Sequence, residues 1–146
     1  MNTVLQFVVA MFGTLSFAIL FHAPRKEYLW CSVTGGLGWV VYLFLVQAHA
    51  SVAIATLCAT FILTILSRVL SYRREKPVTV FLIPGIFPLV PGAGIYYTAY
   101  YFISNLKGQF FSKAVETTLI AGSIALGIFF GSLLPQIWFR RLFQKR

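Results

Sequence analysis

Long apolar stretches separated by short polar segments dominate this chain. A helix needs about 20 predominantly apolar residues to cross the hydrocarbon core of a bilayer. Four stretches satisfy this simply, at about residues 4–21, 28–47, 51–72 and 117–139. The pattern predicts an all-α integral membrane protein whose first partner is the lipid bilayer. We expect residues 1–146 to form a single transmembrane domain.

A fifth apolar stretch, at about residues 78–104, is interrupted by three prolines and three glycines. They are Pro84, Gly85, Pro88, Pro91, Gly92 and Gly94. Proline removes a backbone donor and clashes with the preceding helical turn, and glycine adds backbone freedom. The two apolar halves would rise roughly 15 and 18 Å as helices, which together match a core of about 30 Å. The stretch therefore predicts a fourth span broken midway, either crossing as two half-helices or dipping in and returning.

The distribution of basic residues favours the crossing. The basic residues fall in four groups. Two loops on one side hold Arg25 and Lys26, and Arg68, Arg73, Arg74 and Lys76. The loop on the other side holds Lys107 and Lys113, and the C-terminal tail holds Arg140, Arg141, Lys145 and Arg146. A crossing span puts ten of them inside and two outside, whereas a re-entrant dip gives eight and four. The positive-inside rule then predicts five spans in the plasma membrane, with the N-terminus outside and the C-terminus cytoplasmic.

Composition agrees with this frame. The chain is 59% hydrophobic and 10% charged, and its net charge is +9. Because the bases cluster at the ends of apolar spans, we interpret them as orientation signals and expect no nucleic-acid partner. Cys31 and Cys58 lie within spans, where small buried hydrophobes are expected. No pattern indicates a metal site, a cofactor or an enzyme's nucleophile, so we expect a protein that is not an enzyme.

Small residues mark one face of the last span. Ser123, Gly127 and Gly131 recur at four-residue spacing, which allows close approach of another helix. This face either packs within the chain or joins another subunit.

The chain has three acidic residues, Glu27, Glu75 and Glu116. We expect Glu27 and Glu75 to be solvated partners of basic residues in their loops. Glu116 opens the predicted last span and is read as interfacial, near a helix N-terminus; the alternative is a role in proton coupling. No carboxylate falls at mid-membrane, so the chain looks incomplete as a proton-coupled transporter.

The broken span is the best candidate for a substrate path, because interrupted membrane helices commonly bind transported solutes. Free amides where the second half begins would hold a carboxylate, and free carbonyls at the end of the first half would hold an ammonium group. The second half also carries Tyr97, Thr98, Tyr101 and Asn105, of which Tyr97, Tyr101 and Asn105 share one face by four-residue spacing. The alternative is a kinked helix with interfacial tyrosines.

The run from Leu82 to Gly92, Leu-Ile-Pro-Gly-Ile-Phe-Pro-Leu-Val-Pro-Gly, is followed by Tyr96 and Tyr97. It resembles the proline-glycine signature of the threonine/serine exporter family. Nearly the whole chain is similar to the small membrane component of the split, two-subunit members. The resemblance implies a larger membrane subunit as partner and a small-molecule substrate, threonine and serine or, for split members, small dicarboxylates. It also implies that Pro84, Gly85, Pro88, Pro91 and Gly92 line the substrate path.

The first hypothesis is therefore a subunit of a secondary exporter for small polar metabolites. A second is a self-sufficient transporter or channel, built as a homo-oligomer through the face of Ser123, Gly127 and Gly131. A third is a scaffold subunit that does not itself transport.

Overall fold

The structure, a computed structural model, describes residues 2–134, and in this part the chain forms helices joined by short turns. The helices, in chain order, are α1 (Thr3–Leu20), η1 (Arg25–Glu27), α2 (Tyr28–Gln47), α3 (Val52–Arg74), α4 (Thr79–Ile86), η2 (Phe87–Leu89), α5 (Gly92–Ile103) and α6 (Lys107–Leu133). Four of them are long and apolar enough to span a membrane, and α4–η2 with α5 forms a bent pair that makes up to five spans. The predicted fold class, an all-α membrane protein, is confirmed.

Helices α1, α2 and α3 pack at close range because α2 presents glycines to both neighbours. Gly36 faces α1, where a Cβ would lie 2.8 Å from Met11 Cγ, and Gly38 faces α3, where a Cβ would lie 2.6 Å from Leu63 Cδ1. In lipid, helix association depends on this kind of close van der Waals packing. Gly36 and Gly38 therefore place α2 in the middle of the bundle.

The second half of α6 packs on α3 through the predicted small-residue face. A Cβ on Gly127 would lie 2.8 Å from the Leu57 carbonyl oxygen, and one on Gly131 would lie 2.7 Å from Thr64 Cβ. Ser123, Gly127 and Gly131 are all buried. This face is thus used inside the chain, and the homo-oligomer hypothesis loses the surface on which it depended.

Helix α6 differs from the prediction at its start, because it begins at Lys107 rather than near residue 117. The extra turns precede the apolar run, and they lie alongside α5. The predicted end of this span at residue 139 and the basic tail lie outside the described residues.

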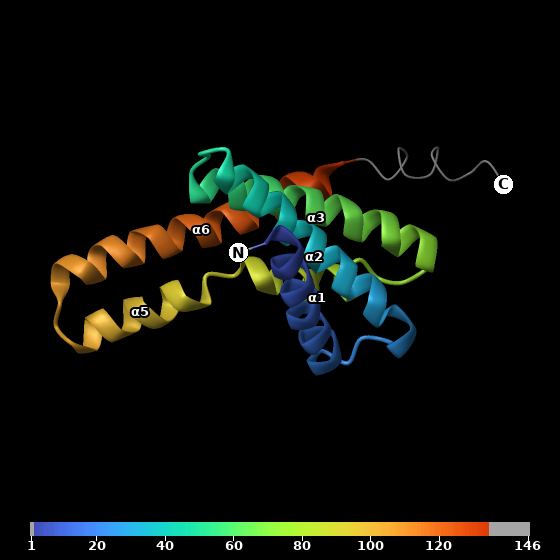
Figure 1. Ribbon diagram of the computed structural model, residues 1–146, viewed down its shortest axis with the longest axis horizontal. Coiled ribbons are helices and arrows are strands. Elements are labelled where there is room, and N and C mark those ends of the chain that lie inside the picture. Colours follow the sequence, from blue (N-terminus) through green and yellow to red (C-terminus); the bar gives the residue numbers. More distant parts are fainter. Residues whose placement is uncertain (1, 135–146) are drawn as a thin grey trace.

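Figure 1 shows α5 and the first half of α6 side by side, projecting from the rest of the bundle. We call α5 with residues 107–121 the arm. No residue of α5 is buried, and the first buried residue of α6 is Ser123. In the described part of the chain, the arm is covered only where its two helices face one another.

Two charged residues lie in surroundings different from the loops expected for them. Glu27 is 3% exposed and accepts hydrogen bonds from Arg74 Nε at 2.8 Å and Nη2 at 3.0 Å, so it is buried rather than solvated. Arg68 lies within α3 rather than in a loop, and its guanidinium donates to the carbonyls of Gly131 and Leu134 at the end of α6. Glu27 thus links η1 to α3, and Arg68 links α3 to α6. The sequence pattern does not predict either pairing.

Candidate functional site

The break in the fourth span follows from its prolines. Pro84 lies inside α4, and Pro88 and Pro91 follow before α5 begins at Gly92. Short-range hydrogen bonds replace the helical ladder: Phe87 N–H donates to Pro84 O, and Val90 N–H donates to Phe87 O at 3.1 Å. The two parts of the span are bent by 53°. The backbone thus leaves the bundle at the predicted motif.

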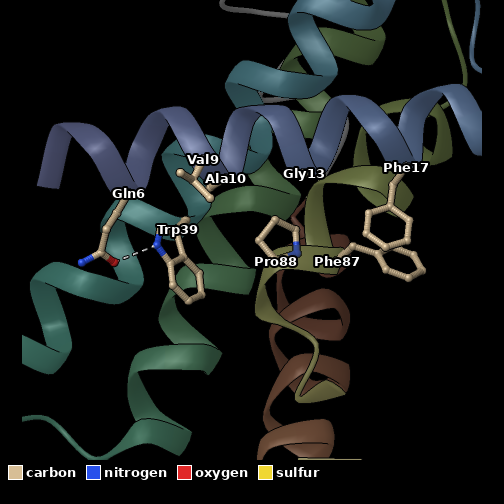
Figure 2. Close-up of a pocket in the computed structure, with 8 residues that line it drawn as sticks. All are labelled: Gln6, Val9, Ala10, Gly13, Phe17, Trp39, Phe87 and Pro88. Atoms are coloured by element: carbon tan, nitrogen blue, oxygen red, sulfur yellow. Dashed lines mark hydrogen bonds between the residues drawn. The ribbon is translucent and has the colours of Figure 1, made fainter. Parts of the chain in front are cut away.

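A cavity of about 270 Å³ lies beside this break, between α1, α2 and η2. Figure 2 shows the eight residues that line it, which are Gln6, Val9, Ala10, Gly13, Phe17, Trp39, Phe87 and Pro88. None of these eight is charged. The cavity is large enough for a small metabolite, and most of its wall is apolar.

Stacked aromatic rings close one end of the cavity. The rings of Phe17 and Phe87 are stacked with centroids 3.9 Å apart, and the Phe21 ring lies 5.2 Å from that of Phe87. Because Phe87 belongs to the 3-10 turn, these contacts hold the break against α1. Figure 2 shows Phe17 descending from α1 onto Phe87.

The opposite end of the cavity is polar. Trp39 Nε1–H donates to Gln6 Oε1 at 3.3 Å, linking the middle of α2 to the beginning of α1. Sequence reasoning missed both residues. A carboxamide within an apolar span was the available signal for Gln6, since polar groups in membrane helices need partners. Trp39 carried a weaker signal, because it lies within the second span rather than at an end.

Of the predicted path residues, Pro88 is brought to this cavity, whereas Pro84 and Gly85 are buried in the bundle. A Cβ on Gly85 would lie 3.4 Å from the Leu63 side chain, so Gly85 permits contact between α4 and α3. Pro84 also lines a second cavity, of about 350 Å³, between the turn after α1 and the start of α4.

The remaining motif residues lie at or beyond the break. Pro91 caps α5, and Gly92 is exposed with open space where a Cβ would stand. Gly94 faces α6, where a Cβ would lie 2.6 Å from Thr117 Oγ1. Thr98 donates to the Gly94 carbonyl at 2.7 Å and lines a cavity between α5 and α6. Gly94 and Thr98 therefore belong to the inner side of the arm.

The predicted face of Tyr97, Tyr101 and Asn105 is correct for the tyrosines alone. The rings of Tyr97 and Tyr101 stack with centroids 6.1 Å apart on α5. Asn105 lies after the end of α5, in the turn to α6, with φ of 56°. This left-handed conformation suits asparagine and ends the helix, so Asn105 is off the tyrosine face.

Glu116 lies within α6 rather than at its beginning. Its carboxylate is exposed and pairs with Lys113 Nζ at 2.8 Å. An exposed pair of this kind contributes little to stability, about 0–1 kcal/mol. The Glu116 carboxylate therefore lies on the arm, and Glu116 is far in sequence from the residues that line the cavity.

A helical bundle with several apolar spans, one of them broken beside a cavity, is an arrangement typical of membrane transport proteins. The family model described as "Threonine/Serine exporter, ThrE" matches residues 6–134. The chain belongs to the threonine/serine exporter family, and the match covers the cavity and the broken span. No solved structure matches the chain.

Proposed function

We propose that this chain is the smaller membrane subunit of a secondary exporter for small polar metabolites, either amino acids like threonine and serine or small dicarboxylates. Its location is the plasma membrane, with the N-terminus outside and the C-terminus cytoplasmic, as the basic residues favour. The broken span crosses the bilayer, and a larger membrane subunit completes the path.

The observation that carries this proposal is the uncovered arm. Tyr96, Tyr97 and Tyr100 of α5 are 65%, 45% and 50% exposed; the rings of Tyr96 and Tyr100 stack, and that of Tyr97 lies edge-on to Tyr96. Phenolic hydroxyls in hydrocarbon are costly without hydrogen-bond partners. A second protein surface against α5 would supply these partners, and the exposed tyrosines therefore support a partner subunit beside the break.

The acidic residues also support an exporter made of two subunits. Glu27 is held by Arg74 and Glu116 by Lys113, and Glu75 is exposed in the turn after α3. A carboxylate that couples transport to protons is expected within the membrane. We assign the proton-coupling carboxylate to the partner subunit. Within this chain, Glu116 is the candidate for that role.

Export by cells that lack the native chain and carry a variant tests the path. Gly92→Leu is the informative substitution, because Gly92 is exposed with open space at its Cβ, so the bundle tolerates a side chain that would block a substrate path between the break and a partner subunit. Gly108→Leu is the matched control, at an exposed, open position on the same arm. We expect Gly92→Leu to insert normally and lose threonine or dicarboxylate export, and Gly108→Leu to export normally. Normal export by Gly92→Leu would favour the scaffold hypothesis.

Purification from native membranes tests the partner. We expect a tagged chain to be isolated with a larger membrane protein, and Tyr97→Cys to cross-link to that protein. Gly108→Cys is the control for nonspecific reaction on the arm. A chain that exports after reconstitution alone would contradict the two-subunit proposal.

A further inference from the structure

Two turns that are far apart in the sequence meet at one end of the bundle. The first follows α1 and includes η1, and the second joins α3 to α4. Arg74 Nε, at the end of α3, donates to Glu27 Oε2 of η1 at 2.8 Å. Figure 1 shows both turns at the same end of α2 and α3. Side chains from the two turns therefore form one surface.

This surface is basic. Its basic residues, which we call the basic cluster, are Arg25 and Lys26 from η1, Arg73 and Arg74 from the end of α3, and Lys76 from the turn that follows. Two acidic residues lie among them: Glu27 is buried against Arg74, and Glu75 is exposed. Because the cations outnumber the carboxylates, the surface has a net positive charge and attracts anions.

Backbone hydrogen bonds fix the shape of both turns. In the first turn, Ala23 N–H donates to Ala18 O at 2.9 Å. In the second, Lys76 N–H donates to Ser71 O at 3.2 Å, and the Ser71 hydroxyl donates back to Lys76 O at 2.5 Å. The basic side chains thus project from ordered backbone, which reduces the entropy that binding a ligand costs.

An apolar cavity lies beside the basic cluster. This cavity, of about 350 Å³, is between the turn after α1 and the start of α4. Phe21 and Ile83 line it and are 45% and 41% exposed. Pro24 also lines it and directly precedes Arg25 of the basic cluster. An apolar cavity next to a group of cations suits a molecule with a hydrocarbon chain and an anionic head.

We propose that this end of the bundle binds one anionic phospholipid, with its phosphate on the basic cluster and an acyl chain in the cavity. Arginine and lysine donate charge-assisted hydrogen bonds to phosphate oxygens. His22 and Thr79, which also line the cavity, provide a ring N–H and a hydroxyl for the ester carbonyls of the lipid. The orientation proposed above places this end at the cytoplasmic leaflet, where anionic lipids attract basic residues beside membrane spans. Binding of the lipid does not depend on export.

The combination of charge and cavity favours a phospholipid over other anions. Inorganic phosphate uses the basic cluster but leaves the exposed Phe21 and Ile83 uncovered. An acidic protein segment brings backbone N–H and C=O groups, which an apolar cavity wall does not satisfy. Phosphatidylcholine has the acyl chains and the phosphate, but its ammonium group is repelled by the cations. An anionic phospholipid meets both parts of the surface.

Native mass spectrometry of the purified full-length protein in detergent tests the proposal. The protein is titrated with phosphatidylglycerol and, separately, with phosphatidylcholine of the same acyl chains. We expect saturable binding of one phosphatidylglycerol, at least about tenfold tighter than phosphatidylcholine, since each basic residue near an anionic lipid contributes about fivefold in affinity. Equal affinities for the two lipids overturn the proposal.

Charge-matched variants separate a site from general attraction. Arg25→Gln with Lys26→Gln removes two exposed cations from the basic cluster and leaves the Arg74–Glu27 pair in place. Lys107→Gln with Lys113→Gln removes the same charge from the arm and is the control. We expect the first variant to bind phosphatidylglycerol more than about tenfold more weakly, and the control to bind like the parent. An equal loss in both variants overturns the site.

A substitution in the cavity tests the acyl chain. Ile83→Trp fills part of the cavity and should weaken phosphatidylglycerol binding, whereas Ile54→Trp, at an exposed isoleucine of α3, should not. Glycerophosphoglycerol, the same head without acyl chains, should not displace the bound lipid at equal concentration. Displacement by it, or unchanged binding in Ile83→Trp, overturns the assignment of the acyl chain. Circular dichroism shows whether each variant retains its helices.

Co-purification from native membranes distinguishes a lipid from an acidic protein. We expect the variant Arg25→Gln with Lys26→Gln to lose co-purified anionic phospholipid and to retain any protein that is isolated with the parent chain. Loss of such a protein with no change in bound lipid would assign the basic cluster to an acidic partner and overturn the lipid site.

Discussion

The Cys31 thiol donates a hydrogen bond to the backbone carbonyl of Val80, with Sγ and O 3.3 Å apart. Val80 lies four residues before Pro84, which has no N–H to donate to it. A carbonyl without a partner is costly in the membrane interior. The thiol of α2 therefore replaces the missing amide of α4 and ties the first half of the broken span to the bundle. Cys31 is fully buried, as expected of a small hydrophobe, but it also has this polar role.

A double-mutant cycle tests the relationship between Cys31 and Pro84. We expect Cys31→Ala to lower the free energy of unfolding by about 1–2 kcal/mol, through loss of the hydrogen bond and of buried contacts. Pro84→Ala restores an amide donor for the Val80 carbonyl, so in that background Cys31→Ala should cost about 1 kcal/mol less. Denaturant unfolding in detergent measures each variant, and Cys58→Ala, at a partly buried thiol, is the control. Equal costs in both backgrounds would refute the coupling.

Gly127 and Gly122 differ in what surrounds them. A Cβ on Gly127 meets Leu57 O and Thr60 Cβ at 2.8 Å, whereas nothing lies within 4 Å of a Cβ on Gly122. Gly127→Ala should therefore destabilise the protein by about 1–3 kcal/mol. Gly122→Ala should be neutral or stabilise it by up to about 1 kcal/mol through helix propensity. Thermal unfolding compares the two. A fall in oligomer size by light scattering, with unchanged unfolding, would indicate instead that this face joins copies of the chain.

Removal of Arg74 leaves the Glu27 carboxylate without its two charge-assisted hydrogen bonds. The Arg74 side chain is 35% exposed and that of Glu27 is 4% exposed. We expect Arg74→Gln to lower the free energy of unfolding by more than loss of a fully exposed ion pair would, because the buried Glu27 carboxylate loses its counter-charge. Adding Glu27→Gln should recover part of this loss, because a neutral carboxamide needs no counter-charge. Arg25→Gln, an exposed residue of the same turn as Glu27, is the control in chemical unfolding, and an equal cost for it would contradict the assignment.

Arg68 stabilises the last turn of α6 from α3. Its guanidinium donates to Gly131 O at 3.1 Å and Leu134 O at 2.8 Å, and also to Ser132 O. Free carbonyls at a helix end attract cations and donors. We expect Arg68→Leu to raise amide exchange in residues 128–134 by about tenfold, and Arg68→Lys to have a smaller effect because it retains charge without the planar fork. Hydrogen-exchange mass spectrometry measures this. Unchanged exchange in Arg68→Leu would show that the hydrogen bonds from Arg68 do not stabilise the end of α6.

Much of the membrane architecture was predictable from local properties. The spans at about 4–21, 28–47 and 51–72 match α1, α2 and α3, because the thickness of the hydrocarbon core sets a length that each stretch meets independently. The break was also local, since proline acts on its own turn. The start of α6 was missed, because residues 107–116, which mix Lys107, Lys113 and Glu116 with apolar residues, extend the helix before the apolar run, where the hydropathy signal is weak.

Which side chains meet across the bundle was decided by the tertiary structure. Gln6 and Trp39 are 33 positions apart, and Cys31 and Val80 are 49 apart. The small-residue face of α6 was predictable from the sequence, but its partner, the side of α3 that carries Thr60 and Thr64, was not. In a water-soluble helix an apolar stripe marks the inward face; in these spans the lipid-facing side is equally apolar. The sequence by itself therefore determined that the chain has four long apolar helices and where the break falls. Only packing determined which face of each helix turns inward, and so which polar groups line the cavity.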